Sequence, residues 1–148
     1  MATSITKYNN YILKQNTGVA INWSSDTIKI MLVSSSYIPD VDNHIFKSSI
    51  SDEVVGAGYN SGGATIDSLS AIQSGGILTI RGNSVIWTQH SAGFTNARYG
   101  VIYKDTGINT TSLLVGYIDF GADKNNVNGD LILNFNSTPV NGIIFTSS

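Results

Sequence analysis

The feature that most constrains the fold of this 148-residue chain is a series of short segments in which apolar and polar residues alternate. Alternation with a period of two is typical of half-buried β-strands, because successive side chains of a strand point to opposite faces of the sheet. The segments follow one another at intervals of roughly ten residues, as in antiparallel sandwiches and small barrels. Gly82 and Asn83 predict a hairpin turn between two of them. The expected strands are residues 27–34, 64–69, 77–81, 84–88, 97–104, 113–120, 130–136 and 142–146.

The composition supports strands over helices. Of the 148 residues, 62 are Ser, Thr, Asn or Gly, and 19 Ile and 10 Val add a β-branched population that suits pleated surfaces. A helical spacing of three and four occurs once, at Ile5, Tyr8 and Ile12, and predicts a helix over residues 5–15 that ends before Gly18. We therefore expect a mainly β fold: an antiparallel β-sandwich or a jelly-roll-like barrel of about eight short strands, with a short N-terminal helix or arm.

The segments between the expected strands bear on domain organisation. Residues 35–51 form a long loop, with a turn of helix expected near residues 50–54, and loops of this length usually have a function or lie against another surface. The glycines of residues 56–63 permit tight bends before the next strand. Because no linker or internal repeat is evident, we expect a single β-sandwich domain over residues 1–148, whose residues 1–22 form a helix or arm available to dock on a partner.

Charge and cysteine content exclude several classes of protein. The chain has 8 Lys and Arg against 10 Asp and Glu, so it offers no evident surface for neutralising nucleic-acid phosphates. It has no cysteine, which removes disulfides, thiolate zinc sites and cysteine nucleophiles. The longest apolar stretch, residues 113–118, is far shorter than the roughly 20 residues that span a bilayer, and the N-terminus lacks the apolar core of a signal peptide. We expect neither nucleic acid nor membrane as a partner.

A search for catalytic or metal-binding patterns returns no catalytic residue, no cofactor site and no metal site. His44 and His90 lie 46 positions apart, without a local metal-ligand spacing. Asp40 and Asp42 resemble the opening of a calcium loop, but the glutamate that would close an EF-hand is missing. Residues 123–130 are also rich in oxygen ligands, and a hairpin loop is the simpler interpretation.

Aromatic residues outside the alternating strands are candidates for contacts with a partner. Aromatic side chains at loop or edge positions are enriched at protein interfaces, whereas those within strand patterns usually belong to the core. Six residues of the N-terminal segment and the loops are therefore the candidate partner-binding residues. They are Tyr8, Tyr11, Trp23, Tyr37, His90 and Phe94.

Four stretches together resemble small structural proteins encoded in the virion gene modules of tailed bacteriophages. They are WSSDTIKIML over residues 23–32, EVVGAGYNSGG over residues 53–63, ARYGVIYKDTG over residues 97–107 and LVGYIDFG over residues 114–121. The third and fourth are the most specific, and the resemblance extends over roughly residues 23–135. It implies a particle component without catalytic activity. Some such proteins decorate or cement capsids through β-sandwich domains.

On this resemblance we expect a capsid decoration or cement protein that bridges neighbouring major capsid subunits on the virion surface, after assembly in the host cytoplasm. A low-charge polar surface suits a symmetric assembly, and a homo-oligomer, dimer or trimer, is expected. Edge strands, residues 35–51 and the terminal segment would lie across the capsid subunits, so that many weak contacts add up.

Three alternatives remain open from the sequence. A tail or neck component of the particle fits the same residues. A carbohydrate- or receptor-binding β-sandwich module would be supported by exposed, coplanar aromatic side chains at Trp23, Trp87 or Phe94. An enzyme would require His44 or His90 to meet a carboxylate in a pocket.

Overall fold

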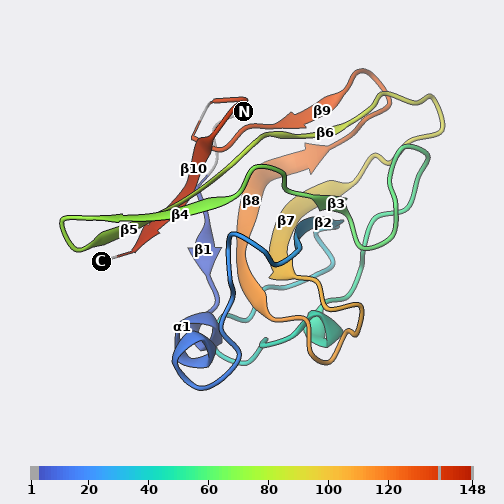
Figure 1. Ribbon diagram of the computed structural model, residues 1–148. Helices are drawn as coiled ribbons and strands as arrows, with labels where there is room; N and C mark the ends of the chain where they lie inside the picture. Colours follow the sequence, from blue (N-terminus) through green and yellow to red (C-terminus); the bar gives the residue numbers. More distant parts are fainter. Residues whose placement is uncertain (1–3, 137, 148) are drawn as a thin grey trace.

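The computed structural model describes residues 4–136 and 138–147, which form a mainly β, sandwich-like fold with antiparallel sheets and one short α-helix (Figure 1). The expected fold class is confirmed. The elements are β1 (Thr6–Lys7), α1 (Asn9–Asn16), β2 (Ile28–Val33), the 3₁₀ helix η1 (Lys47–Ser49), β3 (Ala64–Thr65), β4 (Ser70–Ser74), β5 (Ile77–Gly82), β6 (Val85–Trp87), β7 (Ala97–Lys104), β8 (Leu114–Lys124), β9 (Leu131–Leu133) and β10 (Gly142–Ser147).

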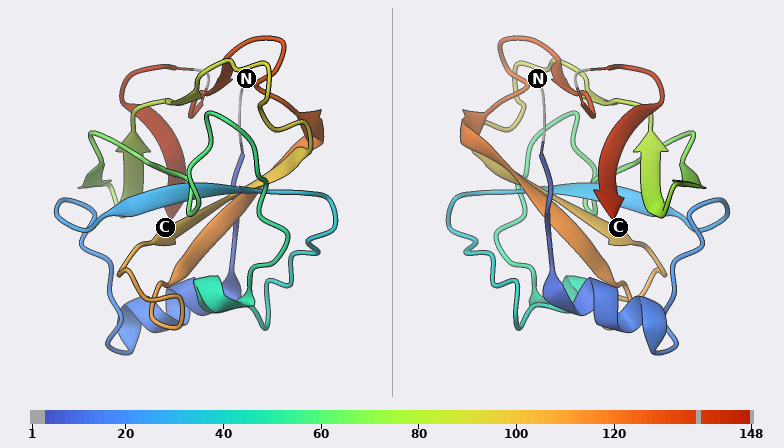
Figure 2. Two further views of the ribbon diagram at one scale, coloured as in Figure 1. Left: turned by 90° about the vertical axis from the view of Figure 1, so that its right-hand side faces the viewer. Right: turned by 90° about the vertical axis from the view of Figure 1, so that its left-hand side faces the viewer.

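The strands form three sheets. The largest has the order β1-β8-β7-β2-β3, the second has the order β10-β5-β4, and β6 and β9 make a two-stranded ladder. The central strands β2, β7 and β8 coincide with the alternating segments that predicted them, and β7 and β8 pair with each other in antiparallel orientation. In Figure 2, α1 lies at the lower end of the molecule and the segment containing β9 at the upper end.

The main hydrophobic core lies between the five-stranded sheet and the two smaller sheets. Ile28, Ile30 and Leu32 of β2 point into it, as the alternation of side chains along a strand requires. Leu133 of β9 and Ile80 of β5 close it from the opposite side. All five side chains are fully buried, so the sandwich is held by apolar burial across its layers.

A second core covers the other face of the five-stranded sheet. Met31 and Val33, which alternate with the residues of the main core, pack there with Val101 and against Tyr37 from the long loop. Residues 35–51 therefore lie against the chain's own sheet, and the expectation that this loop lies against something is met within the molecule. Burial on both faces explains why β2 reads as a nearly continuous apolar run.

Several local predictions are wrong, because the strands pair with other partners than the local sequence indicates. The expected hairpin at Gly82 does not form, because β5 pairs with β4 and β10 while β6 pairs with β9. The hairpin instead joins β4 to β5 at Gly75 and Gly76, whose φ angles of 60° and 82° suit a tight two-residue turn. The strand expected over residues 64–69 is shortened to β3, and the polar strand β4, which was not expected, follows it.

The helical elements are also displaced from their predicted positions. The first turn of the expected helix is taken up by β1, which pairs with β8, so α1 begins only at Asn9. The short turn of helix expected near residues 50–54 occurs earlier, at Lys47–Ser49. Tyr8 donates its backbone N–H to the carbonyl of Val115, so the N-terminal segment docks on the chain's own sheet.

Candidate interaction surfaces

Five of the six aromatic and histidine residues predicted to contact a partner are buried inside the molecule. The exposed fraction is 0–5% for Tyr8, Tyr11, Trp23, Tyr37 and Phe94, and only His90 is exposed. The five buried side chains stabilise the fold and present no contact surface, so the prediction is wrong in that respect. Only His90 remains accessible for the predicted role.

The buried aromatic residues fill gaps at the margins of the two cores. Tyr11 and Trp23 both make edge contacts with Phe145 of β10, at centroid distances of 6.0 and 5.7 Å. Tyr59 makes the same kind of contact with Phe94 at 5.9 Å. These partners are distant in sequence, so periodicity within one segment carries no signal for their burial.

The carbohydrate-binding alternative needed aromatic rings on the surface, and that feature is not found. Trp23, Trp87 and Phe94 have exposed fractions of 5%, 3% and 1%. A sugar ring stacks on an exposed aromatic face, which these three side chains do not offer. No observation on these residues therefore favours a carbohydrate-binding module.

His44 belongs to a hydrogen-bond chain that fixes the long loop. The Asp40 N–H donates to Nδ1 of His44 at 3.3 Å, so this nitrogen is an acceptor, and the Tyr37 hydroxyl donates to it at 2.8 Å. The Tyr8 hydroxyl then donates to Tyr37 at 2.7 Å. This series of hydrogen bonds runs from Tyr8, the residue after β1, through the second core to the long loop. His44 therefore has a structural role in this arrangement.

Buried tyrosines give the fold a sensitivity to alkali. Burial, reinforced by the contact with Tyr37, raises the pKa of Tyr8, and burial raises the pKa of Tyr37 to about 12. Burial also raises the pKa of Tyr11, Tyr59 and Tyr103. Because the unfolded chain loses these protons near pH 10, the stability they contribute is complete below that pH and is lost as the pH rises toward 12.

We expect these five of the seven tyrosines to ionise together with unfolding. A titration that follows tyrosinate absorbance and far-ultraviolet circular dichroism should give one cooperative step above pH 10 in both signals. Tyr37→Phe should reduce the steepness of the stability loss above pH 10, since one linked proton is removed. Ionisation of all seven tyrosines before any loss of the dichroism signal would contradict the expectation.

The side chains of Asp40 and Asp42 accept hydrogen bonds that hold the long loop and α1 together. Asp40 accepts hydrogen bonds from the Asn43 side chain and from the backbone N–H groups of Asp42 and Asn43, and these bonds lower its pKa. Asp42 accepts a hydrogen bond from Asn9 and so ties α1 to the loop. Within residues 4–136 and 138–147, no group of three or more His, Asp or Glu side chains could hold a metal ion.

The glycine-rich segment over residues 56–63 is held by Glu53. Its carboxylate accepts hydrogen bonds from the Tyr59 hydroxyl and the Gly62 N–H, both at 2.6 Å, and from Ser61 at 3.2 Å. The glycines allow this segment to approach the main chain of β2, since a Cβ on Gly63 would lie 1.9 Å from the Ile30 carbonyl oxygen. The glycine-rich segment therefore packs closely against the edge of the sheet.

The β4–β5 hairpin presents the clearest candidate contact surface. It extends to the left of the five-stranded sheet in Figure 1. In the described part of the chain β4 pairs with β5 alone, so its other edge is free. Ile72 and Ile77 lie on its outer face with exposed fractions of 56% and 47%. No charged residue occurs between positions 70 and 80. We call the outer face that carries these two isoleucines the hairpin surface.

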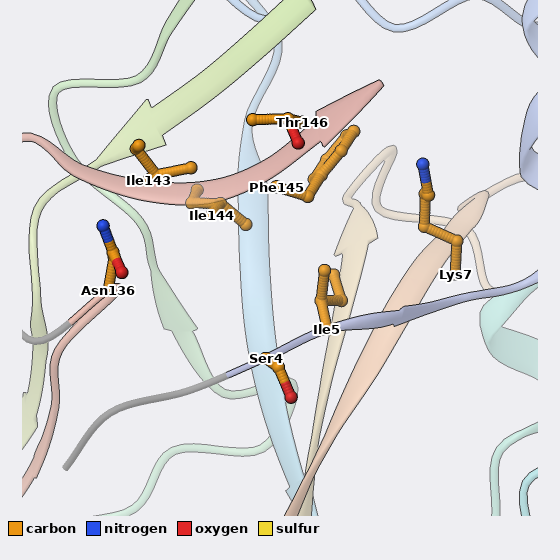
Figure 3. A pocket seen from close by; sticks show the side chains of 8 residues that line it. All are labelled: Ser4, Ile5, Lys7, Asn136, Ile143, Ile144, Phe145 and Thr146. Carbon is orange, nitrogen blue, oxygen red and sulfur yellow. The ribbon is translucent and has the colours of Figure 1, made fainter. Parts of the chain in front are cut away.

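A second candidate is an open cleft of about 370 Å³ between β1 and β10. Figure 3 shows Ile5, which precedes β1, and Lys7 of β1 projecting toward β10, where Phe145 lies. Both strands are at the ends of their sheets. The cleft therefore separates two sheet edges, and no strand of residues 4–136 and 138–147 lies between them.

Comparison with known proteins adds no relative. No protein-family model matches the chain, and neither the curated proteins nor the solved structures contain a match. Among the described residues, no helix is long and apolar enough to cross a membrane.

Proposed function

We propose that this protein is a non-enzymatic structural component of a tailed-bacteriophage particle, and that it acts as a decoration protein on the capsid surface. In this proposal it bridges neighbouring major capsid subunits, as a dimer or trimer, after assembly in the host cytoplasm. The class of protein comes from the resemblance of residues 23–32, 53–63, 97–107 and 114–121 to virion structural proteins. Most of these residues belong to the central strands β2, β7 and β8 and the glycine-rich segment beside them.

The hairpin surface is the observation that carries the proposed mode of action. Natural proteins usually protect a projecting edge strand with charge, proline or a bulge, because an unprotected edge pairs with other chains. The strand β4 has the sequence SAIQS and none of these protections. Exposed Ile72 lies on this strand, and exposed Ile77 lies on the same outer face of the neighbouring strand β5. Such a surface is suited to being covered in an assembly, where symmetry repeats a modest contact many times.

The presence of the chain in particles is tested by mass analysis of purified intact phage, together with solution sizing of the isolated protein. Hundreds of copies per particle are expected of a decoration protein, and a dimer or trimer is expected in solution. A few copies per particle would instead favour the tail or neck component. Absence from particles would overturn both assignments.

The role of the hairpin surface is tested by a charge substitution. We expect the double variant Ile72→Lys/Ile77→Lys to bind particles at least about tenfold more weakly than the wild type in a competition assay, because a lysine at a buried contact loses its hydration. The matched control is Ile108→Lys, which adds charge at a loop isoleucine of similar exposure, 59%, and should bind normally. Equal binding of all three proteins, with unchanged melting temperatures, would exclude this surface.

A further inference from the structure

The cleft between β1 and β10 has backbone hydrogen-bonding groups on one wall. Among the residues that the structure describes, β10 pairs with β5 alone, and Figure 3 shows β5 and β1 on opposite sides of it. Residues 143–146 of β10 form this wall, and the whole strand, Gly142–Ser147, matches the length of an extended peptide of about six residues or 20 Å. The free N–H and C=O groups of an unpaired strand edge can pair with another strand. This wall therefore favours an occupant in an extended conformation.

The pairing registers identify which backbone groups are free. The two-residue turn at Gly75 and Gly76 makes Ser74 and Ile77 a hydrogen-bonded pair, and such pairs alternate along an antiparallel ladder. In β5, Ile77 and Thr79 therefore direct their N–H and C=O groups toward β4. Thr146 is opposite Thr79, so the N–H and C=O of Thr146 point away from β5 and toward the free edge.

The side chains at the cleft define the chemistry of the occupant. Ile5, the residue before β1, and Ile144 and Phe145 from β10 provide apolar contacts. Of the described residues that line the cleft, Lys7 alone is charged, and its Nζ lies 5.1 Å from the centre of the Phe145 ring. In the part of the chain that the structure describes, no salt bridge involves Lys7. An occupant with a carboxylate would complement this charge.

We propose that the cleft between β1 and β10 binds an extended segment of another protein that carries an Asp or Glu side chain. The segment pairs with β10 through the N–H and C=O of Thr146 and adds a strand to the three-stranded sheet. Its apolar side chains contact Ile5 and Phe145, and its carboxylate reaches Lys7. The inference goes beyond the proposed particle function, since any partner that presents such a strand would fit.

The test uses the isolated full-length protein and a blocked, fluorescently labelled peptide of about nine alternating Thr and Val residues with Asp at its centre. We expect saturable binding of this peptide, and at least about tenfold weaker binding when Lys replaces the central Asp. The Lys7→Glu variant should prefer the Lys peptide over the Asp peptide. No saturable binding up to about 1 mM, or an unchanged preference in Lys7→Glu, would overturn the proposal.

A proline scan separates the two free sheet edges. Thr146→Pro removes an N–H that β5 does not use, so the fold should persist while the Asp peptide binds at least about tenfold more weakly. Gln73→Pro is the matched control, because Gln73 pairs with Leu78 and its N–H points to the free edge of β4. That variant should bind the peptide as the wild type does. Equal loss in both variants, or loss in neither, would contradict pairing at β10.

Hydrogen exchange gives a readout that needs no variant. The Thr146 amide should exchange rapidly in the free protein, and saturation with the Asp peptide should slow it at least about tenfold, since a new backbone hydrogen bond protects it. Unchanged exchange at Thr146 with the peptide bound would place the peptide elsewhere. These measurements are made without phage particles, so their failure is distinguishable from failure of the proposed capsid function.

Discussion

Replacing Gly63 with alanine is expected to lower the free energy of unfolding by about 4 kcal/mol, or to prevent folding. A Cβ at this position would lie 1.9 Å from the Ile30 carbonyl oxygen and 2.7 Å from the Met31 Cα. Both atoms belong to the backbone of β2, so no flexible side chain can move aside. The φ angle of 85° adds strain for any residue with a side chain. Denaturant unfolding followed by circular dichroism measures the loss.

Gly107→Ala is the matched control for this prediction. Gly107 has nearly the same φ angle, 80°, but a Cβ there would meet no atom within 4 Å. In this variant the free energy of unfolding should fall by only about 1 kcal/mol, which is what the left-handed conformation costs an alanine. The difference between the two variants then measures the close approach of residues 56–63 to β2. Equal losses of stability in the two variants would mean that the positive φ angle alone explains the effect of Gly63→Ala.

The sequence located most of the strands, but it did not predict which strands pair when the partners lie far apart along the chain. The hairpin β7–β8 shows clear alternation and a turn-rich connection, and both strands were located within a few residues. By contrast, β5 pairs with β10, more than 50 positions away, and this partnership leaves no local pattern. The polar strand β4 was missed because its sequence, SAIQS, lacks a buried face.

The candidate surfaces were harder to predict for a related reason. The aromatic residues chosen as contacts, such as Trp23 and Phe94, stand outside strand alternation because they close the margins of the core from loops. An isolated aromatic residue in a loop has the same local sequence whether it is buried or exposed. The free edges of β4 and β10 follow only from the sheet order, which depends on long-range pairing. Tertiary context therefore decided which residues remained on the surface.

Asn126 is a further example, because it lies in the oxygen-rich stretch over residues 123–130 that was expected to be a simple hairpin loop. The structure buries it completely. Its Oδ1 accepts a hydrogen bond from the Phe94 N–H at 2.9 Å, and its Nδ2 donates to the carbonyl oxygens of Ala57 at 3.0 Å and Thr88 at 2.9 Å. One amide side chain thus joins three loops, and it leaves no space for a Cβ at Gly93.

We expect Asn126→Ala to lower the free energy of unfolding by about 3–4 kcal/mol, because the Phe94 N–H and two carbonyl groups lose their partner in a buried site. Asn16→Ala is the control: Asn16 is exposed and donates one hydrogen bond to the Ile12 carbonyl within α1. Since alanine favours helices, that variant should change stability by less than about 0.5 kcal/mol. Similar effects in the two variants would mean that the Asn126 hydrogen bonds add little.

The isosteric variant Asn126→Asp separates hydrogen bonding from packing. Aspartate keeps the shape and can still accept from Phe94, but its second oxygen then faces the carbonyl oxygens of Ala57 and Thr88. That repulsion and the burial should raise the pKa of the new carboxyl group in the folded state. A raised pKa contributes stability at low pH that disappears as the pH rises, so the variant should unfold more easily at pH 7 than at pH 5, relative to the wild type. A loss of stability that is the same at pH 5 and pH 7 would indicate that packing dominates. It would also mean that the three loops do not depend on the hydrogen bonds that Nδ2 of Asn126 donates.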